Sequence, residues 1–348
     1  MSENEPEGED WRSVSTRAHD HTSLALARQR AEEPRRGRTA SHPAQIPARG
    51  WKDILWRVLL ALPQDRVLAT GGSVAFFALL AVFPGLATVV SLYGLYSDPS
   101  VISQHASLLS GILPAGVLDL LVDQMTHVAQ KSTGTLSTAS ALSLLIAFWS
   151  TNSGVSALFD ALNVIFKERE KRSLLLFYAT TFLFTLGLVI FTLTAISLVV
   201  VLPVILSQVG LGAFADTLIR IARWPVLLVV VGIGLALIYR YGPSRREAKW
   251  RWVTWGAVSA AFLWVAASAM FSWYVASFDS YNRTYGSLGA GIGFMTWIWL
   301  SIVIVLLGAE LDAEMERQTA RDSTDGPSKP LGERAAFAAD TVGPASPG

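Results

Sequence analysis

Residues 173–203 read SLLLFYATTFLFTLGLVIFTLTAISLVVVLP, which is 31 positions without a charged side chain. A helix needs about 20 consecutive apolar residues to cross a bilayer core. This stretch therefore predicts a membrane-spanning helix that tilts or protrudes. Five further runs of suitable length lie on either side of it, at residues 70–96, 138–163, 222–240, 251–277 and 288–311. We expect an all-α, polytopic membrane protein with six transmembrane helices, whose principal partner is the lipid bilayer.

The composition supports this expectation. The chain has 348 residues, of which 51% are hydrophobic and 16% are charged, whereas a soluble domain carries about 25% charged residues. The net charge of +1 provides no basic field for nucleic acid, so no nucleic-acid partner is expected. The chain contains no cysteine, which excludes disulfides and thiolate metal sites, and no motif indicates a cofactor.

Polar segments flank the membrane domain, which we place at residues 49–317. Residues 1–48 and 318–348 contain stretches such as ARQRAEEPRRGR and STDGPSKPLGER. Their apolar content is too low to offset the entropy of ordering, so both tails are predicted to be disordered. Residues 50–66 are amphipathic and too short to span. They predict a helix that lies on the membrane surface or packs under the bundle. Residues 97–137 predict two outer helices, which form either an interfacial pair or a lid over a cavity.

The distribution of lysine and arginine predicts the orientation. Two proposed inner loops carry nine such residues: Lys167, Arg169, Lys171, Arg172, Arg240, Arg245, Arg246, Lys249 and Arg251. The proposed outer segments carry four over a much longer stretch of chain: Lys131, Arg220, Arg223 and Arg283. By the positive-inside rule, both termini are expected on the cytoplasmic side.

The second predicted span shows three stripes when it is projected at 100° per residue. The small residues Ala147, Ser150, Gly154, Ala157 and Ala161 form one stripe, which favours close approach of another helix. The bulky residues Leu144, Phe148, Val155, Phe159, Leu162 and Phe166 form another, which faces lipid or an apolar neighbour. The polar residues Ser153, Ser156, Asp160 and Asn163 form the third. We expect this polar stripe to face protein or water, because an unpaired carboxylate in hydrocarbon is costly.

Asp160 is the most informative residue of the polar stripe. One interpretation is a cavity-lining acid that binds a cation, a proton or a polar headgroup. The other is a structural carboxylate near the inner membrane surface, paired with Lys167 or Arg172. Asn152 lies one residue off the stripe and is expected to hydrogen-bond a neighbouring helix.

The first and last spans carry further candidates. Pro84 lies inside the first span and predicts a kink. Gly289 and Gly293 form a GxxxG pair, which indicates helix packing. Glu310 and Asp312 end the last span, where carboxylates oppose the helix dipole. Basic partners are therefore expected for them in the inner loops, and Glu310 is also a candidate cavity residue.

Three stretches resemble the YihY/BrkB family of bacterial inner-membrane proteins: FFALLAVFPGLATVVSLYG, STNSGVSALFDALNVIFKEREKRS and SFDSYNRTYGSLGAGIGFMTWIWLSIVIVLLGAELDAE. The likeness covers about residues 50–315. It implies a six-helix fold in the bacterial cytoplasmic membrane, with envelope roles and proposed transport. Members were long labelled ribonuclease BN, a name regarded as misapplied. The second stretch departs from the family, which more often carries a basic residue near position 152.

Two function classes follow. The first is a transporter or flippase-like protein for a lipid or small amphiphilic substrate, with Tyr281, Asn282, Arg283 and Tyr285 at the outer mouth. These four residues equally fit a tight interfacial turn. The second class is a non-transporting scaffold for envelope machinery. Ribonuclease activity is not expected, because the five histidines lie in the N-terminal tail or on the outer side. The chain is therefore not predicted to be an enzyme, and the pattern does not predict an oligomeric state.

Overall fold

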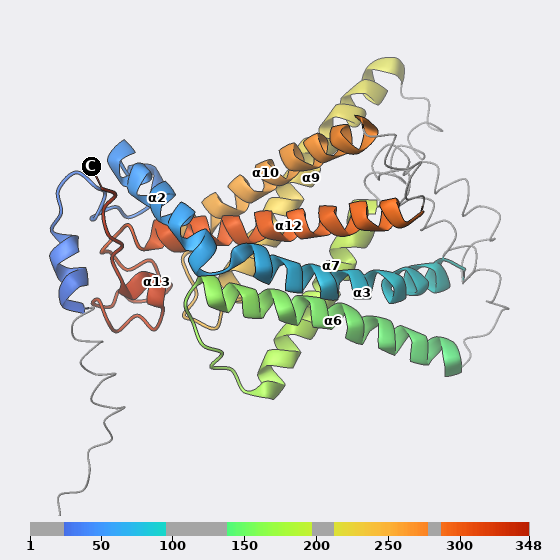
Figure 1. The fold of residues 1–348 in the computed structure, drawn as a ribbon, viewed down its shortest axis with the longest axis horizontal. Coiled ribbons are helices and arrows are strands. Elements are labelled where there is room, and N and C mark those ends of the chain that lie inside the picture. Colours follow the sequence, from blue (N-terminus) through green and yellow to red (C-terminus); the bar gives the residue numbers. More distant parts are fainter. Residues whose placement is uncertain (1–23, 95–137, 197–211, 278–286, 348) are drawn as a thin grey trace, which may run out of the picture.

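A computed structural model describes residues 24–94, 138–196, 212–277 and 287–347 (Figure 1). These residues form helices and connecting segments without a strand, and one isolated antiparallel bridge joins Ala248 to Thr324. The named elements are η1 (Pro43–Gln45), α2 (Ala48–Gln64), α3 (Val67–Gly94), α6 (Thr138–Ile165), α7 (Leu174–Ile196), α9 (Gly212–Tyr241), α10 (Trp250–Ser277), α12 (Ser287–Glu316) and α13 (Phe337–Asp340). The all-α prediction is confirmed for this part of the chain.

Each of the six predicted spans falls on one long helix. Three of them, α7, α10 and α12, contain windows long and apolar enough to cross a membrane: Leu174–Phe191, Trp250–Tyr274 and Gly291–Glu316. Shorter apolar stretches lie in α3 and α9, at Val67–Ala81 and Pro225–Tyr241. The outer helices predicted at residues 97–137 lie entirely outside the described part of the chain, which omits residues 95–137.

Helix α12 lies in the middle of the bundle (Figure 1). It packs against α10, α3, α2 and α6, while α9 packs against α10 and α7 packs against α6. The main core gathers around the second half of α12, where Leu306 and Ala309 are fully buried, together with Leu162 of α6, Tyr239 of α9 and Val253 of α10. This half of the bundle also carries the candidate polar residues.

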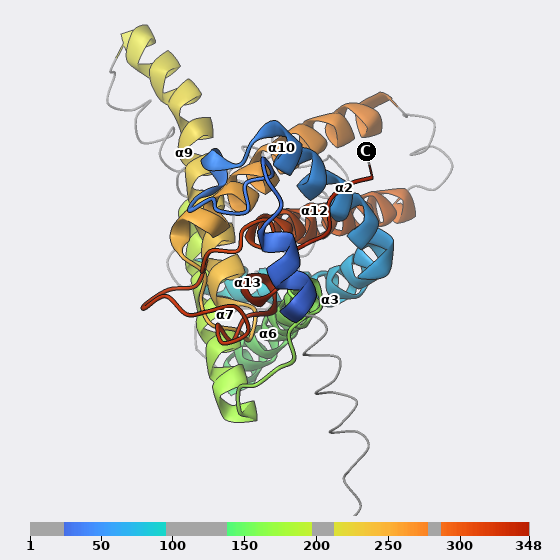
Figure 2. The same cartoon turned by 90° about the vertical axis from the view of Figure 1, so that its left-hand side faces the viewer.

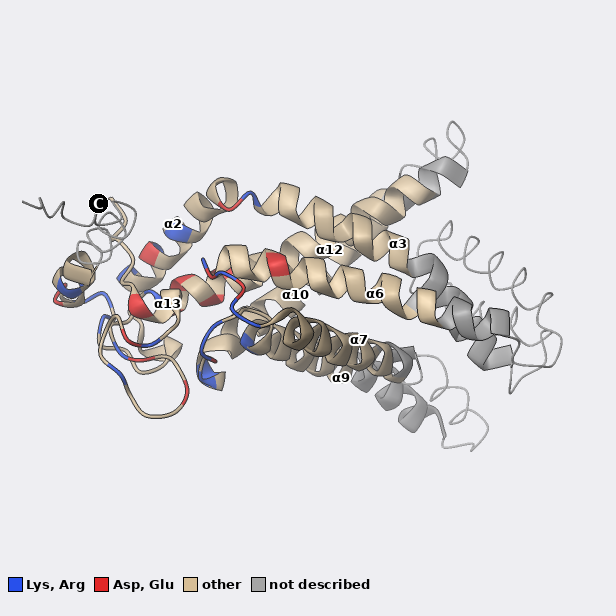
Figure 3. Cartoon of the chain, turned by 90° about the horizontal axis from the view of Figure 1, so that it is seen from below, with Lys and Arg blue, Asp and Glu red and all other residues tan. Residues whose placement is uncertain are grey.

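The outer surface of the long helices is apolar. Large side chains such as Leu183, Val229, Phe262 and Met270 are each more than 40% exposed. Lysine, arginine, aspartate and glutamate instead gather at one end of the bundle (Figure 3). A soluble protein rarely exposes so much contiguous apolar surface, whereas hydrocarbon solvates it. This distribution is that of a membrane protein.

The tails form a folded layer at the charged end of the bundle, which differs from the expected disorder at residues 24–47 and 318–347 (Figure 2). Arg38 donates to the Gly343 carbonyl at 2.8 Å, and the Ala320 amide donates to the Arg38 carbonyl at 2.7 Å. Ala338, Ala339 and other small residues are buried there. The ends of α2 and α12 supply the buried surface that the tails lack on their own, and local composition does not reveal such a partner surface.

Helix α2 combines the two positions predicted for it. Ile54 and Val58 are buried in a small cluster with Trp252 of α10 and Met315 of α12, so the helix packs on the end of the bundle. Leu55 and Leu59 are 54% and 66% exposed. These leucines form an apolar face that a membrane surface would cover.

Candidate functional site

The small-residue stripe of α6 lies against α3, which is its most extensive partner. A Cβ atom built on Gly154 would lie 3.6 Å from the backbone of Ala78, an ordinary contact distance. Ser150 and Ala157 are half-buried, and the side chain of Ala147 lies outside the described part of the chain. The two helix backbones therefore approach closely along this stripe, as small residues permit.

The bulky stripe faces α7 and the core. Phe148 stacks on Phe182 with ring centroids 5.4 Å apart, and Phe159 meets Phe184 edge to face at 5.1 Å. The Thr185 hydroxyl donates to Asn152 Oδ1 at 3.2 Å, and both side chains are buried. The predicted hydrogen bond from Asn152 to a neighbouring helix is therefore confirmed, with α7 as the partner.

Asn163, at the inner end of the polar stripe, is buried and joins three segments. Its Nδ2 donates to Glu170 at 3.0 Å, and its Oδ1 accepts from the Ser244 amide at 2.7 Å. Burial alone would raise the pKa of Glu170, but hydrogen bonds from Arg172 and Asn163 outweigh it and lower that pKa to about 2. Glu170 thus stays ionised at neutral pH and holds the turn between α6 and α7 in place.

Asp160 lies on the exposed side of α6. Neither predicted partner pairs with it, because Lys167 lies 4.0 Å from Asp65 and Arg172 binds Glu170 at 2.7 Å. Within the described part of the chain, Asp160 forms no hydrogen bond or ion pair. The acid therefore does not serve as the structural carboxylate that pairs with either of these cations.

Two serines precede Asp160 on the same side of the helix. Ser153 is half-buried and donates to the Trp149 carbonyl at 3.2 Å. The buried hydroxyl of Ser156 has no hydrogen-bond partner among the described residues. Leu145, Trp149 and other exposed side chains share this surface. We call the surface formed by Leu145, Ile146, Trp149, Ser153, Ser156, Asp160 and Val164 the α6 face.

A second polar group lies at the inner end of α12, where four carboxylates alternate along the helix. Glu310, Asp312, Glu314 and Glu316 are all at most 2% exposed. A spacing of two residues places successive side chains on opposite sides of a helix. The carboxylates therefore face different partners, and they do not form one cluster.

The predicted basic partners bind the second half of this series. Arg57 of α2 and Arg317 contact Glu314, while Arg245 makes a bidentate pair with Glu316 at 2.8 and 3.0 Å. The expectation that inner-loop cations pair with Glu310 and Asp312 is thus not met. Sequence reasoning missed Glu314 and Glu316, and a signal for them was present in the charge repeat ELDAEME at residues 310–316.

Glu310 and Asp312 have fewer partners. Asp312 Oδ1 accepts from the Gly256 amide of α10 at 2.7 Å. Within the described residues, Asp312 Oδ2 and Glu310 Oε2 are buried without a hydrogen-bond partner. No group of three or more metal-ligating side chains lies together in the residues described here.

The remaining candidates fall on or near other gaps. Tyr281, Asn282, Arg283 and Tyr285 lie outside the described residues, so their role at an outer mouth stays a prediction. Helix α3 continues through Pro84, whose side chain is likewise outside the described part, and the kink stays a prediction. Gly289 lies in the first turn of α12, and a Cβ atom built on Gly293 meets no atom of the described residues within 4 Å.

Comparison with known proteins places the chain among membrane proteins. A family model described as Virulence factor BrkB matches residues 58–332. The ribonuclease-like protein YfkH of Bacillus subtilis is 31% identical over 70% of this chain and 88% of its own length. A UPF0761 membrane protein of Cronobacter sakazakii is 25% identical over 80% of this chain and 94% of its own length.

A further UPF0761 membrane protein, from Stenotrophomonas maltophilia, is 28% identical over 75% of this chain, and the match spans 59% of that relative's length. No solved structure matches the chain. The family model covers far more than half of the sequence and includes α6, α12 and the C-terminal tail up to residue 332. This chain belongs to the BrkB family of membrane proteins.

Proposed function

We propose that the chain is a multi-pass protein of the bacterial cytoplasmic membrane, with six spans and both tails in the cytoplasm. Six long helices support this topology, and so does the concentration of charge at one end of the bundle (Figure 3). The excess of lysine and arginine in the loops at that end favours a cytoplasmic position.

The natural absence of cysteine makes this topology testable with single introduced cysteines. In intact cells, Ser132→Cys should react with a membrane-impermeant maleimide. Ser328→Cys, in the exposed part of the C-terminal tail, should react only after permeabilisation. Labelling of Ser328→Cys in intact cells would contradict the orientation.

Within that topology, we propose that the chain moves an amphiphile across the membrane, with the headgroup passing along the α6 face. The observation that carries this proposal is the exposed carboxylate of Asp160, which has no ion-pair partner in the described residues and follows Ser153 and the buried hydroxyl of Ser156 on the same side of α6.

The energetic argument concerns the cost of an acid on an apolar surface. A carboxylate costs about 2.5–3.5 kcal/mol at the centre of a spanning helix on insertion scales, and ionisable residues within spanning helices mark functional pathways. Asp160 lies five residues before the end of α6, so its cost is below that range. Leu145, Ile146 and Trp149 are exposed on the same face. An amphiphile fits both features, because its headgroup solvates the polar side chains while its acyl chains stay in the bilayer.

A liposome assay tests this directly. Purified protein is reconstituted with a headgroup-labelled fluorescent phospholipid, and the fraction accessible to an impermeant quencher is followed with time. We expect protein-dependent movement of the lipid that slows about ten-fold in Asp160→Asn, which corresponds to about 1.4 kcal/mol of lost stabilisation on the path.

The matched control is Glu333→Gln, which neutralises an exposed carboxylate in the C-terminal tail, away from the α6 face. It should leave the rate unchanged. Equal rates in empty and protein-containing liposomes would contradict the proposal for this lipid class, and so would an Asp160→Asn rate equal to that of the natural chain.

A scaffold role is the second candidate, because the two tails form a folded layer at the cytoplasmic end rather than free polar segments. Such a layer offers a defined docking surface. A stable co-purifying partner, combined with a cellular function that survives Asp160→Asn, would favour this role over transport. Neither role involves the ribonuclease activity suggested by the name of the Bacillus relative, and we propose a non-enzymatic function.

A further inference from the structure

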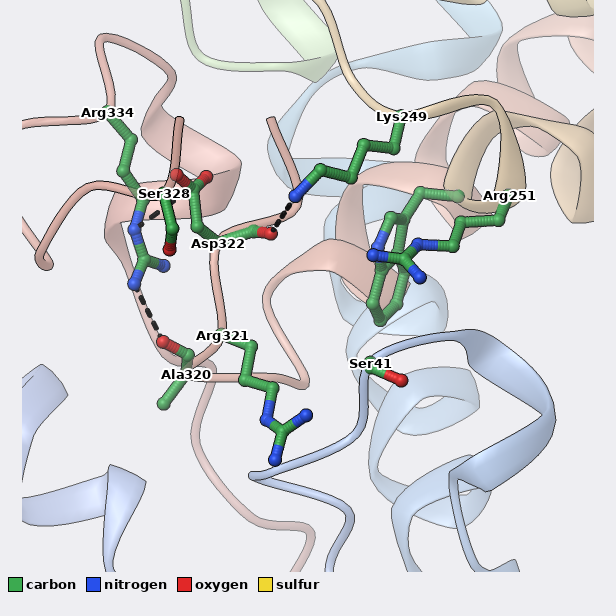
Figure 4. A pocket seen from close by; sticks show the side chains of 9 residues that line it. Ser41, Lys249, Arg251, Ala320, Arg321, Asp322, Ser328 and Arg334 are labelled. Carbon is green, nitrogen blue, oxygen red and sulfur yellow. Dashed lines mark hydrogen bonds and ion pairs between the residues drawn. The ribbon is translucent and has the colours of Figure 1, made fainter. Parts of the chain in front are cut away.

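A cavity of about 440 Å³ lies where the start of α10 meets the two tails (Figure 4). We call it the tail pocket. Its lining residues come from the N-terminal segment, the beginning of α10 and the C-terminal tail: Ser41, Lys249, Arg251, Trp252, Ala320, Arg321, Asp322, Ser328 and Arg334. Four of these side chains are cationic and one is a carboxylate, so the pocket has a strong positive charge.

Two of the four cationic side chains, Arg334 and Lys249, form hydrogen bonds with the backbone of the C-terminal tail. Arg334 donates to the carbonyls of Ala320 and Ala339 at 2.8 and 2.7 Å, and Lys249 donates to the Asp322 carbonyl at 3.0 Å. The Asp322 carboxylate accepts from the amides of Thr324 and Lys329 and lies 3.9 Å from Arg334. These groups form the walls of the pocket.

Arg251 and Arg321 remain available. Both residues are exposed, and neither side chain forms a hydrogen bond or an ion pair with any residue in the described ranges. Figure 4 shows Arg251 extending from the start of α10 and Arg321 from the C-terminal tail. Two guanidinium groups with free donors are the preferred partners of phosphate, which they bind in a bidentate manner.

The start of α10 strengthens the same preference. Lys249 and Arg251 flank the first residue of this 28-residue helix, whose first turn contains no acidic residue. The free amides of a helix N-terminus attract negative charge. Trp250 and Trp255, in the first two turns of α10, are 47% and 44% exposed, and exposed tryptophans near the end of a spanning helix indicate the depth of lipid headgroups.

We propose that the tail pocket binds a phosphate-bearing anion. The guanidinium groups of Arg251 and Arg321 both bind this anion, which thereby connects the C-terminal tail to α10. The site is separate from the α6 face and does not depend on transport. A phospholipid headgroup and a free phosphate compound share this chemistry, and the exposed tryptophans at the start of α10 favour the headgroup.

Two binding measurements on the full chain in neutral detergent separate these sources. Native mass spectrometry measures retention of phosphatidylglycerol relative to phosphatidylcholine. Thermal unfolding with and without inorganic phosphate measures binding of a soluble anion. The test variant is Arg251→Gln with Arg321→Gln, and its control is Arg28→Gln with Arg169→Gln, which removes two exposed arginines that do not line the pocket.

We expect phosphatidylglycerol retention to fall about ten-fold or more in the test variant and to stay unchanged in the control. Stabilisation by inorganic phosphate that disappears only in the test variant would also support the pocket, with a soluble ligand. The proposal is overturned if the natural chain shows neither effect, or if both double variants respond as it does. Because both arginines are exposed, the test variant should fold normally, which its unfolding temperature without anion verifies.

Discussion

Replacing Gly256 by alanine will sharply reduce the amount of folded protein recovered from membranes. Helices α10 and α12 cross where Gly256 faces Gly308. A Cβ atom on Gly256 would collide with the Gly308 carbonyl oxygen and lie 2.5 Å from the Asp312 carboxylate. The first of these obstacles is backbone, which moves only if the helices separate. Overpacking of a core costs about 1–3 kcal/mol and occasionally more, and we expect a loss at or above the top of that range.

The measurement is the yield of monodisperse protein after detergent extraction, together with its thermal unfolding midpoint. Gly234→Ala is the matched control, because it makes the same substitution in α9, where a Cβ atom meets nothing within 4 Å among the described residues. Alanine favours helix over glycine by about 1 kcal/mol, so this control should unfold at the natural temperature or slightly above. An unchanged midpoint for Gly256→Ala would show that α10 and α12 are not in this close contact.

These glycines show which features of the fold can be predicted from the sequence and which cannot. The GxxxG pair of Gly289 and Gly293 is a visible motif, yet no described residue lies within 4 Å of a Cβ atom built on Gly293. Gly256 and Gly308 belong to no shared motif, and their contact depends on which helices become neighbours. The apolar run of a spanning helix is a local property, so the positions of the six long helices could be predicted. The partners of each helix are not local.

The same distinction applies to the candidate site. The three stripes of α6 follow from helical periodicity. In the structure, Gly154 of the small stripe lies toward α3 and Phe148 of the bulky stripe lies toward α7, but these partner helices are not readable from the periodicity. The exposure of Asp160 could not be predicted, because it depends on the absence of a described helix over that side. The folded tails were missed for a related reason, since contacts such as Arg38 with Gly343 join residues 305 positions apart.

The second large effect is expected at Arg57, which connects three parts of the chain at the charged end of the bundle. Its guanidinium contacts the Glu314 carboxylate, donates to Gln318 at 2.8 Å and donates to the Pro344 carbonyl at 3.0 Å. The side chains of Arg57 and Glu314 are only 4% and 3% exposed. Burial lowers the pKa of Arg57, and the charge of Glu314 opposes this shift. Arginine nevertheless stays charged at neutral pH.

We expect Arg57→Met to destabilise the protein by about 3–5 kcal/mol, because it leaves Glu314 buried with less compensation. Arg49→Met is the control, since it removes an exposed arginine from the same helix. Thermal unfolding in detergent measures the loss. Limited proteolysis measures the second consequence, which is earlier cleavage of the C-terminal tail once the bond to Pro344 is gone.

A double variant separates the ion pair from the tail contact. When Glu314→Met is added to Arg57→Met, the buried carboxylate that Arg57 compensated is removed as well, although Arg317 then loses its contact with Glu314. An apolar pair of similar volume often restores stability. We expect the unfolding temperature to recover in part while the tail remains sensitive to protease, because the methionine at position 57 has no donor for Pro344. If Arg57→Met alone leaves both readouts unchanged, the tail layer does not depend on this residue. If the double variant protects the tail, contacts such as that of Arg38 with Gly343 hold it without Arg57.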